Sequence, residues 1–83
     1  MPLYMDIHQH VPGIAPEMMA QAVEADLRVQ AKYGVKYLRY WYSEAAGKAF
    51  CLVEAPSKEA ASAVHREAHG MVADEIFEVY EGG

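Results

Sequence analysis

Cysteine is nearly absent from this 83-residue sequence, which contains only Cys51. A single cysteine excludes an internal disulfide, and it excludes zinc sites built within one chain from four cysteines or from two cysteines and two histidines. Basic residues are also few, with 7 lysines and arginines against 12 acidic residues and a formal charge of −5. Because proteins that bind nucleic acid without sequence preference need a basic face, we expect cations rather than nucleic acid as partners.

Long apolar runs and a targeting segment are missing as well. No stretch approaches the roughly 18–20 apolar residues of a membrane span, so we expect no membrane partner. The opening segment MPLYMDIHQH has neither a basic start nor an apolar centre, which argues against a secretory signal. These absences predict a cytoplasmic protein.

The composition is that of a globular protein, with 53% hydrophobic and 23% charged residues, and it excludes a disordered tail. The length predicts a single domain that spans residues 1–83. A chain of this size buries only about 60–65% of its unfolded surface, so its core is thin. Association with a second copy is a common way to add buried area to such a core.

Hydrophobic periodicity predicts four strands and two helices. Residues 3–11 alternate with period two, as in a half-buried strand. Pro16 suits the first position of a helix and Gly34 the position just past its end, while Ser57 and Gly70 have the corresponding roles for a second helix. The predicted strands are 3–11, 35–43, 49–55 and 74–80, and the predicted helices are 16–33 and 58–69.

This order of elements, β-α-β-β-α-β, indicates an α+β fold of the ferredoxin-like type. In that fold two helices cover one face of a four-stranded antiparallel sheet. We expect the uncovered face to carry Tyr37, Trp41, Phe50 and Leu52. A face this apolar should not remain in water, so we predict a homodimer packed sheet to sheet, which makes a dimeric α+β barrel.

The four histidines fall in two short clusters. His8 and His10 are two residues apart on a predicted strand, so both side chains leave the same face. His65 and His69 are four residues apart on a predicted helix and share one side of it. Either pair can present imidazoles to a cation. Neither spacing is specific, however. The ordinary alternatives are an exposed strand face for the first pair, and a core-edge residue and a helix end for the second.

The strand histidines share their face with Asp6. If the apolar side of this strand meets the helices, the polar side points into the barrel, where charged groups need partners or a metal. Acidic residues that can join them are Glu54 on the third strand and Asp74 and Glu78 near or on the last. The ordinary alternative is a surface acid at a strand end for Glu54, and a solvated turn before the strand for Asp74 and Glu75. Imidazole with carboxylate and without thiolate suits Ni, Zn, Co, Mn or Fe(II).

Other polar or reactive residues stand in unusual surroundings. Asp26 lies within the apolar stripe of the first helix, and we expect it to bond a tyrosine hydroxyl or Arg39. Tyr37, Arg39 and Trp41 either line a pocket for an anionic or aromatic ligand or simply pack together. Cys51 has no basic neighbour in the sequence, so we expect an inert, buried thiol.

Three segments resemble a family of small bacterial proteins whose actinobacterial branch binds nickel and has a ferredoxin-like domain. They are FCLVEAPS at residues 50–57, HREAHG at 65–70 and ADEIFEV at 73–79. The opening Met5-Asp6-Ile7-His8 fits the same branch. The Cys-x-x-Glu-Ala-Pro stretch is typical of the wider family, and the two helical histidines are typical of the branch that binds metal.

The resemblance implies a dimeric α+β barrel that holds nickel inside, in octahedral geometry, through histidine and acidic side chains. His10 is a further candidate ligand, although Gln9-His10 departs from the adjacent histidine pair expected after Asp-x-His. The ligands that the resemblance implies are His8, Glu54, His65, His69 and Glu78. Weaker candidates, as ligands or as acceptors that orient a histidine, are Asp6, Asp74 and Glu75.

We therefore expect a cytoplasmic, non-enzymatic homodimer that binds Ni(II), and that sequesters or buffers it, with other divalent transition metals competing for the site. One alternative is a cofactor-free monooxygenase, because dimeric ferredoxin-like barrels also host such enzymes, an argument from fold analogy alone. Another alternative is a small-ligand-binding domain without metal.

Overall fold

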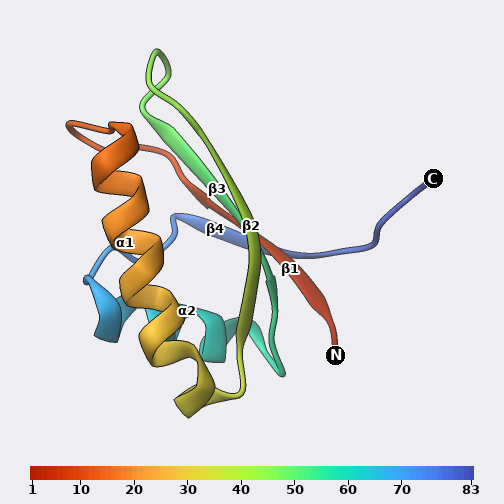
Figure 1. Ribbon diagram of the computed structural model, residues 1–83. Coiled ribbons are helices and arrows are strands. Elements are labelled where there is room, and N and C mark those ends of the chain that lie inside the picture. Colours follow the sequence, from red (N-terminus) through yellow and green to blue (C-terminus); the bar gives the residue numbers. More distant parts are fainter.

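The computed structural model describes residues 1–83 and has α+β architecture, with one four-stranded antiparallel sheet and two long helices (Figure 1). The strand order β2-β3-β1-β4 is that of a ferredoxin-like fold. No helix is both long enough and apolar enough to cross a membrane. The elements are β1 (Leu3–His8), α1 (Pro16–Val29), η1 (Gln30–Tyr33), β2 (Lys36–Ser43), β3 (Lys48–Glu54), α2 (Lys58–Ala68) and β4 (Glu75–Val79).

All six predicted elements are present, and local signals begin and end the helices. Pro16 occupies the first turn of α1, and Gly34, with φ of 67°, ends the short η1 turn that continues the helix. Ser57 caps α2, where its Oγ accepts a hydrogen bond from the Ala60 amide at 3.1 Å. At the other end of α2, Gly70, with φ of 82°, turns the chain away.

β1 ends three residues earlier than its alternating pattern predicts. The Gln9 amide donates to Asp74 Oδ2 at 2.6 Å, and the Val11 amide donates to the Gly47 carbonyl at 2.9 Å. These bonds draw the chain away from the ladder after His8. Long-range partners that are invisible in the local sequence therefore set this strand end.

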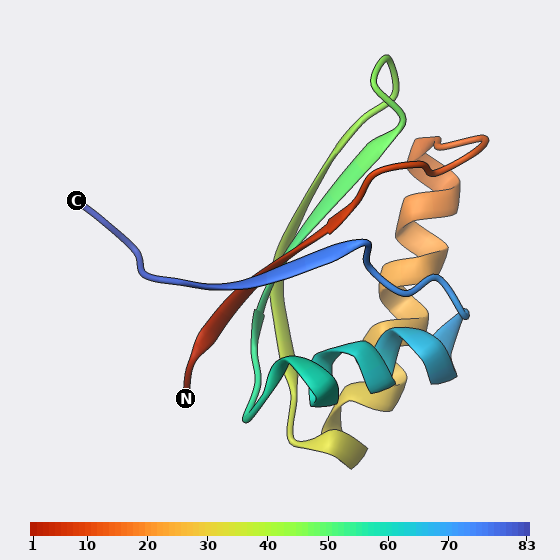
Figure 2. The same cartoon turned by 180° about the vertical axis from the view of Figure 1, so that it is seen from behind.

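Both helices lie on one side of the sheet, as the front and back views agree (Figures 1 and 2). The side they cover is the polar side of β1, opposite to the expectation. Asp6 and His8 are buried there, and the apolar side of β1 lies on the uncovered face. The reason is the partner strand, because Asp6 pairs with Cys51 and His8 with Ala49, which belong to the most buried face of β3.

A β-bulge in β2 corrects a second expectation. Tyr37 pairs with Val53, but the next aligned pair is Arg39 with Leu52, so the ladder skips Leu38. One extra residue reverses which side the following residues face. Tyr37 consequently faces the helices and was wrongly expected on the uncovered face. The uncovered face does carry three of the predicted residues, Trp41, Phe50 and Leu52.

The apolar core between sheet and helices is divided by polar residues. One cluster is small, and in it Val11, Met19 and Ala49 pack near the start of α1. Between the clusters lie four buried polar side chains, which is unusual for a core this thin. The larger cluster consists of Val35, Val53, Ala55, Ala61 and Val64, and the buried polar residues are Asp6, His8, Asp26 and His65.

Candidate metal centre

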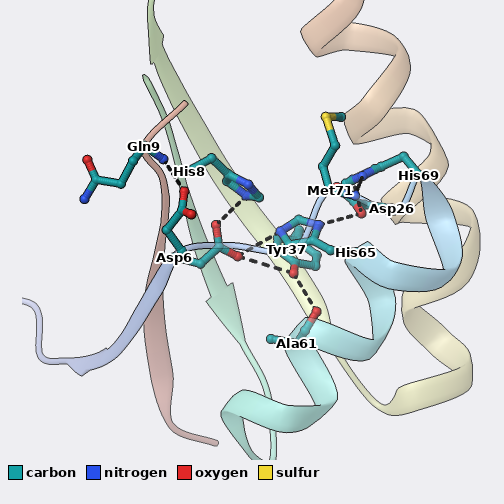
Figure 3. A network of polar contacts seen from close by, with 10 residues as sticks. Asp6, His8, Gln9, Asp26, Tyr37, Ala61, His65, His69 and Met71 are labelled. Atoms are coloured by element: carbon teal, nitrogen blue, oxygen red, sulfur yellow. Dashed lines mark hydrogen bonds and ion pairs between the residues drawn. The ribbon is translucent and has the colours of Figure 1, made fainter. Parts of the chain in front are cut away.

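A chain of alternating imidazoles and carboxylates runs through the centre of the protein (Figure 3). Its members come from β1, α1, the second half of α2 and the residue directly after α2, so tertiary packing brings them together. The order along the chain is His8, Asp6, His65, Asp26 and His69.

His65 is the middle of this chain and contacts both carboxylates. Its Nε2 lies 2.9 Å from Asp6 Oδ2, and its Nδ1 lies 2.9 Å from Asp26 Oδ1. At the two ends, His8 Nε2 lies 3.3 Å from Asp6 Oδ1, and His69 Nε2 lies 3.1 Å from Asp26 Oδ1. The three central residues are at most 2% exposed, so water does not screen these contacts.

The two short contacts require His65 to be an imidazolium ion. Ionised carboxylates only accept hydrogen bonds, so both ring nitrogens must carry hydrogens to satisfy them. Burial by itself lowers the pKa of His65, but the hydrogen bonds to Asp26 and Asp6 outweigh burial and raise it to about 11. Burial likewise raises the pKa of Asp6, and its contacts with His65 and His8 outweigh that effect and lower it to about 2.

Asp26 is the second ionised carboxylate of the centre. Burial raises its pKa, but hydrogen bonds from His65 and His69 more than offset this, and the net effect lowers the pKa. In the metal-free protein, the proton on His65 is thus the cation that holds two buried carboxylates together. These three residues carry two negative charges and one positive charge.

The end of α2 fixes the tautomer of His69. Its Nδ1 accepts a hydrogen bond from the Met71 amide at 3.1 Å, so the ring hydrogen lies on Nε2 and points at Asp26. The turn after α2 also holds this residue in place, because the His69 and Gly70 amides both donate to the His65 carbonyl. His65 and His69 therefore both contact the carboxylate of Asp26.

One buried oxygen of this centre lacks a partner. Asp6 Oδ1 is fully buried and accepts no hydrogen bond, because His8 Nε2, although only 3.3 Å away, does not meet it with hydrogen-bond geometry. An unsatisfied buried acceptor costs about 1–3 kcal/mol. A cation beside Asp6 would remove this cost.

The residues around this oxygen fit a transition metal. Donor atoms of four buried residues all lie within 4.8 Å of one another, and they offer a carboxylate, two imidazoles and a thiol. A second group, Asp26, His65 and His69, also meets this distance limit but has no unpartnered oxygen. The first group consists of Asp6, His8, Cys51 and His65.

Tyr37 closes the side of the centre near α2. Its hydroxyl donates to the Ala61 carbonyl at 3.0 Å and lies 3.5 Å from Asp6 Oδ2. Burial and the charge of Asp6 raise the pKa of Tyr37, so the phenol remains neutral. The Tyr37 ring also packs against the His65 ring, with 4.8 Å between centroids. Tyr37 therefore positions the imidazole.

Three of the six predicted ligands, His8, His65 and His69, lie together in this centre, and the weaker candidate Asp6 joins them. They point between sheet and helices and not into a barrel, which corrects the expectation for His8. The physical reason is the face of β1 that the helices cover.

The other three predicted ligands lie elsewhere. His10 is exposed beyond the end of β1. Glu54 pairs with Leu3 and belongs to the uncovered face of the sheet, and Glu78 is exposed on β4, where its Oε2 accepts a hydrogen bond from Tyr80 at 3.2 Å. A single chain does not bring these residues to His65.

The remaining acidic candidates have structural roles, and one expectation is wrong. Asp74 and Glu75 both bind Gln9, at its amide and its side chain, and hold the segment that follows β1. Asp26 was expected to bond a tyrosine or Arg39 but bonds His65 and His69, because its turn of α1 faces α2.

Comparisons with known proteins agree with the fold. A family model described as "Nickel responsive protein SCO4226-like" matches residues 4–79. Among solved structures, the chain is similar to SCO4226 from Streptomyces coelicolor A3(2), with 40% sequence identity and a TM-score of 0.91, over 98% of this chain and 99% of that one. The comparison with curated proteins gives no match.

Proposed function

We propose, from the premise that this chain belongs to the nickel-responsive SCO4226-like family, that it binds nickel through Asp6, His8 and His65. The observation that carries this proposal is the unpartnered, buried Asp6 Oδ1, which lies 3.3 Å from His8 Nε2 in a carboxylate whose other oxygen contacts His65. A buried acceptor of this kind is rare in proteins and needs an explanation. A bound cation supplies one.

An ion in this place would take over the role of the proton on His65. The ion supplies positive charge beside Asp6, while Nδ1 of His65 keeps its hydrogen and its bond to Asp26. A carboxylate behind a ligating imidazole orients the ring and raises its basicity. His69 would in turn hold Asp26. Asp26 and His69 are thus positioning residues in this proposal.

The choice of metal rests on the family and on the donor types. Imidazole and carboxylate suit Ni(II), and they also suit Zn(II) and Cu(II), which compete in solution. The description of the family as nickel-responsive favours nickel. We propose sequestration or buffering of Ni(II) as the role, with no catalysis, and the cytoplasmic location stays a prediction.

We also propose that two copies pack through the uncovered face of the sheet. Trp41 is 47% exposed on this face, and Leu38 and Phe77 are exposed as well. An apolar groove follows the same face, and such a surface is typical of an interface. Its lining includes Leu3, Met5, Leu38, Trp41, Leu52 and Val79. A second copy on this groove would form the dimeric α+β barrel.

The monooxygenase alternative has less support. It requires His, Arg and Trp around one cavity. Arg39 and Trp41 line the groove on the uncovered face, whereas His65 lies on the opposite side of the sheet among the helices. Metal binding is therefore the function that the geometry favours.

A nickel titration of untagged protein tests the proposal. We expect His8→Gln to weaken nickel binding about 10-fold or more, because it removes a donor beside Asp6. His10→Gln is the matched control, since it changes the same residue type two positions along the chain, outside the centre. Calorimetry with elemental analysis measures both.

The titration has two contrary outcomes. Wild-type protein that binds no nickel would contradict the function. Equal losses in the two variants would contradict the site and return His10 to the ligand set.

A further inference from the structure

Cys51 was predicted to be an inert, buried thiol, but it lies beside the donor atoms of the candidate metal centre. It lies on the buried face of β3, directly opposite Asp6, and only 5% of it is exposed. Its Sγ lies within 4.8 Å of the donor atoms of Asp6, His8 and His65. The neighbouring residues on the same face are Ala49 and Val53. The Cys51 thiol therefore lies between two apolar residues along β3, close to the donor atoms of the centre.

We propose that Cys51 is a fourth ligand, a thiolate that makes the centre selective for thiophilic divalent ions over hard ones. The inference rests on the proposed function and deepens it. A lone buried cysteine often serves as a small hydrophobic side chain. Here the unpartnered oxygen of Asp6 lies in the same cluster and points independently to a cation.

The chemistry of the step is a ligand exchange. A water ligand leaves the hydrated ion, the S–H bond of Cys51 breaks and its proton passes to solvent, and a sulfur lone pair binds the ion without any change of oxidation state. Together with the proton displaced from His65, one dication replaces two protons. The net charge buried in the centre is then unchanged, so binding through sulfur adds no uncompensated buried charge.

A thiolate changes which metals the centre prefers. Thiolates favour ions such as Ni(II), Zn(II), Co(II) and Cd(II), whereas carboxylates and water suffice for Mn(II) and Mg(II). A centre made only of imidazole and carboxylate would discriminate between these groups less strongly. Cys51 is therefore a specificity-determining residue in this inference.

The optical spectrum of the Co(II)- and Ni(II)-loaded wild-type protein is the first test. We expect a thiolate-to-metal charge-transfer band in the near ultraviolet, recorded on untagged protein without a thiol reductant. Because the chain has a single cysteine, such a band belongs to Cys51. Bound metal without the band would overturn the inference and leave the proposed function standing. Protein that binds neither metal would overturn both.

The second test compares metals in the Cys51→Ser variant. We expect the affinity for Cd(II) to fall about 10–100-fold or more, as for loss of a residue that supports a metal site, and the affinity for Mn(II) to stay the same. A merely structural role would weaken both ions equally, and that result would overturn the inference. If the variant does not fold, the wild-type spectrum decides alone.

Discussion

His65 shows why single residues in this core need a functional explanation. A buried ion network gains little stability over a well-packed apolar core of the same shape, because its charges must leave water. This chain nevertheless buries an imidazolium and two carboxylates in a small core that has few apolar side chains. The proposed exchange of a metal ion with the proton on His65 would explain why this costly network is present.

Asp26→Asn tests whether the network supports metal binding from outside the ligand set. The change removes the negative charge behind His65 and keeps a side chain of similar shape. We expect nickel affinity to fall about 10–100-fold, as for other carboxylates behind a ligating histidine. Glu24→Gln on the same helix is the control, because Glu24 forms only an exposed pair with Arg28, which contributes little. Equal nickel affinities in the two variants would contradict the positioning role.

The metal-free protein should lose stability as pH rises above neutrality. The folded-state pKa of His65, about 11, exceeds its ordinary value of 6.5, so its contribution is complete below about pH 6.5 and is lost toward pH 11. The pKa of Asp6 is lowered from 3.8 to about 2, so its contribution is present above 3.8 and lost as pH falls through 2. We expect urea denaturation to give a lower free energy of unfolding at about pH 8.5 than at about pH 5.5.

The upper pH in this comparison stays below 9.0, the ordinary pKa of a cysteine thiol, so that Cys51 does not dominate the result. A free energy of unfolding that is constant or higher at the upper pH would argue against an imidazolium at His65.

Residue types and spacing predicted part of this centre. The clusters that contain His8, His65 and His69 are visible as short-range patterns in the sequence. Asp26 gave a signal too, as an acid on an apolar stripe, but its partners lie 39 positions and more away and follow from helix packing. Cys51 gave none, because only the register of β3 against β1 brings it to Asp6.

At the scale of elements, the sequence predicts extents better than faces. Helix ends follow local signals such as Ser57 and Gly34, and these were recognisable, whereas the end of β1 depends on long-range hydrogen bonds. Which side of β1 meets the helices depends on its pairing with β3, and which side Tyr37 takes depends on the bulge at Leu38. Periodicity cannot show either, because both sides of a strand have the same period.

The cap of α2 matters because this helix carries His65, and His69 follows directly after its last residue. Ser57→Ala removes the hydroxyl that accepts the Ala60 amide, and we expect it to lower the free energy of unfolding by about 1 kcal/mol. Ser57→Gly should lower the free energy of unfolding by only about a few tenths of a kcal/mol, since glycine is tolerated at the N-cap position. Urea denaturation of the metal-free variants measures both. A larger loss for glycine than for alanine would show that the cap does not act through this bond.

At the scale of the molecule, the sheet separates two surfaces with different proposed roles. The candidate metal centre lies between the sheet and the helices, and all its donor atoms come from the same chain. The apolar groove lies on the other face, where no helix covers it (Figure 2). Assembly and metal binding are therefore expected to be separable, which differs from a barrel that holds metal at its centre.

Leu52→Glu tests this separation. Leu52 lies on β3 near the middle of the uncovered face, and a carboxylate there would have to be buried without a partner in the dimer. We expect light scattering at micromolar concentration to give about twice the 9.2 kDa chain mass for the wild type and a single chain mass for the variant. Ala20→Glu, which adds the same charge to an exposed position on α1, should remain dimeric.

The monomeric Leu52→Glu variant should bind as much nickel per chain as the wild type, because all the proposed ligands come from one chain. A variant that is monomeric, folded and unable to bind nickel would show instead that the second copy completes the site, and a wild type that is monomeric throughout would contradict the barrel.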